Sequence, residues 1–96
     1  MIRVILERKL ESAVLDEALI PDSLYDFQDG LCLLGNLDKF SYDSFNSDQM
    51  PAVINELRIL MNRDGVYVSH YVNALELAEI CQNRKETSLT FTPFAD

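Results

Sequence analysis

Apolar residues follow a strand-like pattern in three short segments of this 96-residue chain. Residues 1–8 are rich in β-branched side chains and partly alternate with polar ones, which predicts a strand. Residues 88–94 alternate Leu and Phe with Ser and Thr, which predicts a second strand, and Pro93 places its end at an edge or rim of the sheet. Residues 31–34 form a continuous apolar run between Gly30 and Gly35, which is typical of a buried central strand.

Two helices are predicted between residues 47 and 85. In the first, apolar residues at positions 50, 53, 54, 57, 60 and 61 form one stripe. Ser47 is the expected N-cap, Pro51 fits the first turn, and residues 62–65 supply a stop. The second helix begins near Val68 or Ser69 and ends at residues 82–85, where basic side chains suit the negative end of the helix dipole.

Residues 10–30 fit two interpretations. Leu10, Val14 and Ala18 have helical spacing, whereas residues 13–15 could belong to a second strand that closes a hairpin with residues 1–8. Pro21 ends either element. With either choice the sequence predicts one domain, residues 1–96, of the α+β class. We expect a small antiparallel or mixed sheet of three or four strands with two α-helices packed on one face.

The formal net charge of −8 is concentrated in residues 10–48, which contain nine carboxylates and a single base, Lys39. Such a segment repels nucleic acid and anionic lipid and attracts a cationic partner. We therefore expect a basic protein as partner, with no direct binding to nucleic acid or to a membrane. No apolar run is long enough for a membrane span, and residues 1–11 do not resemble a signal peptide, which predicts a cytoplasmic protein.

The chain offers little catalytic chemistry. His70 is the single histidine, and the common phosphate-, dinucleotide- and zinc-binding motifs are missing, so we predict no enzyme, no cofactor and no metal. Residues 38–48 contain oxygen ligands for calcium but lack the glycine and the acidic pair of an EF-hand loop. Cys32 and Cys81 both sit in apolar runs and are expected to be reduced core thiols; a disulfide would require an oxidising compartment.

Aromatic residues are interleaved with the carboxylates of the acidic segment. Their rings either anchor two loops to the core or form the packed centre of an interface whose rim is acidic. Under the second interpretation, the acids raise the association rate and the rings carry more of the affinity. The predicted partner-binding residues are Asp16, Glu17, Asp22, Tyr25, Asp26, Asp29, Asp38, Tyr42, Asp43 and Asp48.

Three segments carry a family resemblance: residues 30–38, residues 44–57 leading into the first helix, and the closing segment around residues 89–96. In their pattern of hydrophobicity and turns they resemble small acidic bacterial immunity proteins of contact-dependent inhibition and other polymorphic toxin systems. The resemblance implies a non-catalytic inhibitor that binds a cognate toxin domain, often a basic nuclease. The alternative is an acidic adaptor or regulatory subunit, with or without homodimerisation, that has no toxin partner.

Overall fold

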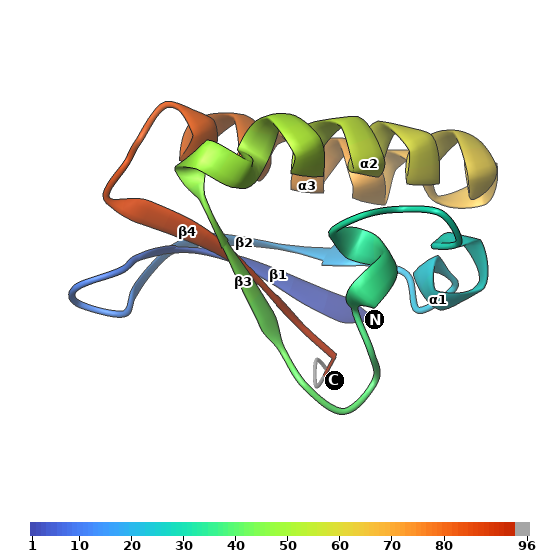
Figure 1. The fold of residues 1–96 in the computed structure, drawn as a ribbon, viewed down its shortest axis with the longest axis horizontal. Coiled ribbons are helices and arrows are strands. Elements are labelled where there is room, and N and C mark those ends of the chain that lie inside the picture. Colours follow the sequence, from blue (N-terminus) through green and yellow to red (C-terminus); the bar gives the residue numbers. More distant parts are fainter. Residues whose placement is uncertain (94–96) are drawn as a thin grey trace.

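A computed structural model describes residues 1–93 and contains one antiparallel sheet with two helices on one of its faces (Figure 1). The strands are β1 (Ile2–Arg8), β2 (Ala13–Ile20), β3 (Asp43–Asn46) and β4 (Thr87–Thr92), in the order β2-β1-β4-β3. The helices that cover the sheet are α2 (Met50–Arg63) and α3 (Val68–Gln82). The predicted α+β class, with its two helices on one face, is therefore confirmed.

The ambiguous segment after residue 10 forms the second strand of a hairpin. Leu6 pairs with Asp16 whereas Glu7 pairs with Val14, so Leu15 is an extra residue that forms a β-bulge in β2. The turn that joins the strands contains Ser12 at a φ of 50°, the one non-glycine residue with positive φ in the part of the chain that the structure describes. The helical interpretation of this segment is wrong, because Val14 and Ala18 lie on opposite faces of a strand that is paired along its whole length with β1.

The two predicted helices are both present, although the first is capped differently from our expectation. The side chain of Asn46, not that of Ser47, accepts a hydrogen bond from the backbone N–H of Gln49, and the Gln49 side chain accepts one from the backbone N–H of Asn46. This capping box begins a 3-10 turn, η2 (Ser47–Gln49), that continues into α2 with Pro51 in its first turn.

The predicted central strand at residues 31–34 is wrong. This segment bends and continues into a 3-10 turn, η1 (Leu34–Asn36), because its backbone N–H groups find a side-chain acceptor in place of a strand partner. Those of Leu33 and Leu34 donate to the carboxylate of Glu56 in α2, at 3.1 and 2.8 Å. Cys32 is consequently exposed and not a core thiol as predicted, whereas Cys81 is buried; both are free.

The closing strand is confirmed as β4, which pairs with β1 on one side and β3 on the other. It ends at Thr92, immediately before Pro93; Phe94, the end of the predicted strand, lies outside the described residues. The fourth strand, β3, comes from a segment for which no strand was predicted. It forms the short edge of the sheet opposite β2.

A second buried carboxylate joins the helices to the turn that follows β2. Asp64, directly after α2, accepts hydrogen bonds from the hydroxyl of Ser23 and from that of Tyr71 in α3, the latter at 3.0 Å. Burial, followed by the contact with Asp64, raises the pKa of the Tyr71 phenol well above its ordinary range. The phenol therefore stays protonated and bonded to Asp64 at neutral pH.

The two faces of the sheet have different surroundings. Ile2, Val4 and Leu6 of β1 point into the core beneath the helices and pack with Leu89 and Phe91 of β4. The alternate residues point to the other face, which no helix covers (Figure 1). Among residues 1–93, no helix is long and apolar enough to cross a membrane.

Candidate protein-binding surface

Four of the predicted partner-binding residues come together at one end of the sheet. Tyr25 belongs to the short helix α1 (Leu24–Phe27), and its hydroxyl donates to the backbone carbonyl of Asp38 at 3.3 Å. Burial raises the pKa of Tyr25, and the negative charges of Asp22, Asp38 and Asp43 raise it further. We call these four residues, Asp22, Tyr25, Asp38 and Asp43, the acidic cluster.

Two cationic groups lie in contact with the acidic cluster. The Nζ atom of Lys39 is 5.6 Å from the centroid of the Tyr25 ring, and the amino group of Met1 is 3.2 Å from a carboxylate oxygen of Asp22. Asp22, Tyr25, Lys39 and Pro93 line a shallow hollow of about 220 Å³. Among residues 1–93, the negative charge of the acidic cluster is therefore only partly compensated.

Asp38 shapes the loop that lies beside the acidic cluster. Its Oδ1 accepts hydrogen bonds from the backbone N–H groups of Phe40 and Ser41, at 2.7 and 2.9 Å. The N–H of Phe40 makes the largest contribution to lowering the pKa of Asp38, so the turn is held by an ionised carboxylate. The loop leaves the side chains of Phe40 and Tyr42 exposed, at 87% and 68%.

The aromatic residues of the acidic segment therefore divide into two groups. Phe45 is buried and meets Phe91 edge-on, with ring centroids 5.8 Å apart, while Tyr25 and Phe27 are half-buried against the core. Phe40 and Tyr42 contribute little to the core. The first interpretation drawn from the sequence thus fits three rings, which anchor loops to the core, and the other two rings are exposed.

The remaining predicted residues are spread over other parts of the surface. Asp26 and Asp29 are exposed in α1 and just after it, near the acidic cluster in sequence. Asp16 and Glu17 lie on β2, one edge of the sheet, while Asp48 lies in η2, which follows the opposite edge strand. The sheet order therefore separates Asp16 and Glu17 from Asp43 by two intervening strands.

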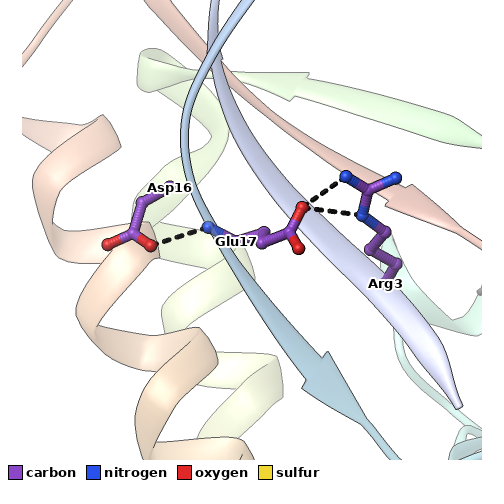
Figure 2. Close-up of polar contacts among 3 residues, drawn as sticks. All are labelled: Arg3, Asp16 and Glu17. Carbon is purple, nitrogen blue, oxygen red and sulfur yellow. Dashed lines mark hydrogen bonds and ion pairs between the residues drawn. The ribbon is translucent and has the colours of Figure 1, made fainter.

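Asp16 and Glu17 are also engaged within the chain. Figure 2 shows the Glu17 carboxylate accepting from the guanidinium of Arg3, whose Nε lies 2.8 Å away, and the Asp16 carboxylate accepting from the backbone N–H of Glu17. On the same edge strand, Nδ1 of His70 lies 3.2 Å from the carbonyl oxygen of Leu19. The side chains of Asp16 and His70 thus occupy two backbone groups of this edge strand, the N–H of Glu17 and the carbonyl of Leu19. Unoccupied groups of this kind can pair with another strand.

The helix-free face of the sheet contains a hollow that was not predicted from the sequence. It measures about 260 Å³ and is lined by Arg3, Ile5, Glu7, Tyr42, Thr90 and Thr92. We call it the sheet hollow. The alternation of Arg3, Ile5 and Glu7 with the core residues of β1 could have predicted that these three side chains share a face. The pairing of β1 with β4 is needed to place Thr90 and Thr92 beside them.

The single histidine lies between β2 and the turn before α3. The contacts of His70 are the carbonyl of Leu19 and the ring of Tyr67, whose centroid is 5.8 Å away. Within residues 1–93, no group of three or more His, Cys, Asp or Glu side chains is placed to hold a metal ion. Another hollow, of about 440 Å³, lies against α2 and α3 and includes the Arg58–Glu79 pair at 4.0 Å.

Comparisons with known proteins add no assignment. No protein-family model, no curated protein and no solved structure matches this chain.

Proposed function

We propose that this chain is a non-catalytic, protein-binding inhibitor of the bacterial immunity class, which neutralises a cognate, basic toxin domain such as a nuclease in the cytoplasm. The observation that carries the proposal is the position of two exposed rings, Phe40 and Tyr42, beside the acidic cluster. Aromatic side chains are enriched at the centres of protein interfaces, and charges at the rim steer association.

Partial compensation of charge supports a cationic partner. Lys39 is the single base in residues 10–48, and it already lies over Tyr25. Lysine and arginine side chains of a partner would meet Asp22, Asp26 and Asp43 around that position. Such a surface blocks a basic active site or a nucleic-acid-binding site by occupying the region that would otherwise attract phosphates.

The hydrogen-bonded turn at residues 38–41 also supports tight binding. Because the Asp38 carboxylate holds the backbone of Phe40 and Ser41, the two exposed rings are presented on a folded turn. A preorganised loop loses less conformational entropy on binding than a flexible one does.

The test is calorimetry with the basic C-terminal domain encoded by the neighbouring reading frame, at low and moderate salt. The triple variant Asp22→Lys, Asp26→Lys, Asp43→Lys should abolish binding, and rising salt should weaken binding by the wild type. Glu11→Lys, Glu76→Lys, Glu79→Lys is the matched control, because both triples change the formal charge from −8 to −2. Asp38 is left unchanged because it builds the turn. If wild-type protein and this domain form no complex at either salt concentration, the proposal is wrong.

The second candidate is a homodimeric adaptor without a toxin partner. One observation favours it: β2 exposes Val14, Leu15 and Leu19, at 52%, 38% and 41%. Sedimentation velocity over a range of concentrations distinguishes the two candidates. A dimer that persists at high salt would favour the adaptor, whereas a monomer would favour the inhibitor.

A further inference from the structure

We propose that the sheet hollow receives an arginine side chain of the partner protein, an inference that rests on the proposed function and names a second point of contact. The hollow runs along the helix-free face beside β1 and β4. Ile5 lies between Arg3 and Glu7 along β1, and the exposed ring of Tyr42 forms part of the wall.

The charges in the sheet hollow indicate a cationic occupant. The guanidinium of Arg3 donates to the Glu17 carboxylate through both Nε and Nη2, so its positive charge is compensated within the chain (Figure 2). Glu7 forms no ion pair with any of residues 1–93; its Oε1 accepts a hydrogen bond of 2.8 Å from the Thr90 hydroxyl. The uncompensated charge of the hollow is therefore the negative charge of Glu7.

The chemical groups that line the sheet hollow favour arginine over lysine. A planar guanidinium can stack on an aromatic ring and can donate two hydrogen bonds to a carboxylate, whereas an ammonium is a compact, strongly hydrated charge. The sheet hollow offers the ring of Tyr42, the aliphatic surface of Ile5 and the carboxylate of Glu7 in one depression. The register puts Tyr42 level with Thr92, at the Arg3 end of the hollow, so an arginine with its head at Glu7 packs its stem over Ile5 and toward the Tyr42 ring.

Continuity with the acidic cluster connects the hollow to the same partner. Tyr42 lines the sheet hollow, and its neighbour Asp43 belongs to the acidic cluster. Asp43 pairs with the core residue Phe91, so its side chain points to the helix-covered side, whereas Tyr42 lines the opposite face. The two sites therefore meet at the edge formed by β3, and a basic protein contacts both by extending around this edge.

The test is a ¹⁵N–¹H NMR titration of the full chain with the peptide acetyl-Gly-Arg-Gly-amide. Citrulline in place of arginine gives an isosteric neutral control, and glutamate in place of arginine tests for an anion at Arg3. We expect saturable shifts of the Ile5, Glu7 and Thr90 amides with the arginine peptide alone. Glu7→Gln, which keeps an acceptor for Thr90, should weaken that binding about tenfold, because it removes a charge-assisted hydrogen bond. Glu76→Gln, on exposed surface of α3, should leave it unchanged.

Several results would overturn the inference. They are arginine-dependent shifts confined to residues 22–29 and 38–43, equal shifts with the citrulline peptide, shifts at Arg3 with the glutamate peptide, or no shifts at all. Self-association through this face, seen as concentration-dependent sedimentation that Tyr42→Ala abolishes, would also overturn it.

The inference and the proposed function can fail separately. If the neighbouring toxin domain does not bind but the arginine peptide occupies the sheet hollow, only the proposed function is wrong. If the toxin domain binds and Glu7→Gln does not weaken the complex, only the arginine contact is wrong.

Discussion

The hydroxyl of Thr90 donates a hydrogen bond of 2.8 Å to the carboxylate of Glu7, joining β4 to β1 on the face of the sheet that no helix covers. The hydroxyl of Ser44, on β3, lies 2.6 Å from that of Thr90. Because Thr90 gives its only hydroxyl hydrogen to Glu7, Ser44 must be the donor to Thr90. The chain of hydrogen bonds therefore runs across three strands and ends at the carboxylate of the sheet hollow.

Thr90→Val should lower the free energy of unfolding by about 1–2 kcal/mol, since it leaves Glu7 without its donor and Ser44 without its acceptor. Thr90 is only 6% exposed, so water cannot easily take the place of its hydroxyl. Ser44→Ala should cost less, because Ser44 is exposed and lies at the end of the chain of hydrogen bonds. Urea denaturation of both variants measures the difference. Equal losses would contradict this account of the network.

Glu56→Ala should destabilise the protein by about 2–4 kcal/mol, because the backbone N–H groups of Leu33 and Leu34 would lose their acceptor in a buried site. Glu56→Gln retains one acceptor oxygen and should cost less than half as much. Glu76→Ala, at an exposed position of α3, is the control and should change stability little. Hydrogen exchange at Leu33 and Leu34 gives the local measurement, and unchanged protection in Glu56→Ala would contradict the prediction.

The elements with strong periodicity could be predicted from the sequence. The apolar stripe of α2, the face of α3 and the strands β1 and β4 are where the pattern places them, to within about one or two residues. The errors occurred where a contact between distant segments decides the structure. The apolar run at residues 31–34 is no strand because Glu56, more than twenty positions later, takes its N–H groups. Asn46, in contrast, could have been preferred to Ser47 as cap, since the matching glutamine stands three residues later.

The candidate surface could be predicted only in part. The local excess of acids identified Asp22, Asp38 and Asp43, which lie around Tyr25 because two loops meet at one end of the sheet. The same charge count included Asp16 and Glu17, which strand order places on the far edge. Glu7 was overlooked because its segment has balanced charge. Its lack of an ion pair with residues 1–93 depends on which strands lie beside β1.

The exposed and buried rings of the acidic segment should respond differently to truncation. Phe45→Ala should lower the free energy of unfolding by about 3–5 kcal/mol, because the ring is 7% exposed and packs on Phe91. Phe40→Ala and Tyr42→Ala should change it by less than about 0.5 kcal/mol. Both should nevertheless weaken the toxin complex at least about fivefold if these rings form the centre of the interface. Denaturation and calorimetry on the same samples separate the two effects, and full affinity in the double variant would exclude these rings as the centre.

The Tyr71 phenol should make the protein less stable at alkaline pH. The folded state raises the pKa of this phenol, so above its ordinary pKa of about 10 the unfolded chain releases the proton while the folded chain retains it. The unfolded state then binds fewer protons, and stability falls as the pH rises.

Tyr71→Phe should be less stable than the wild type at pH 7 by about 1–2 kcal/mol, because Asp64 loses a donor. Since phenylalanine does not titrate, the difference should shrink by about 1.4 kcal/mol by pH 11. Denaturation curves of both proteins between pH 7 and 11 test this, with Tyr67→Phe on the exposed turn before α3 as the control. A difference that stays constant with pH would mean that the contact with Asp64 does not hold the phenol in its protonated form.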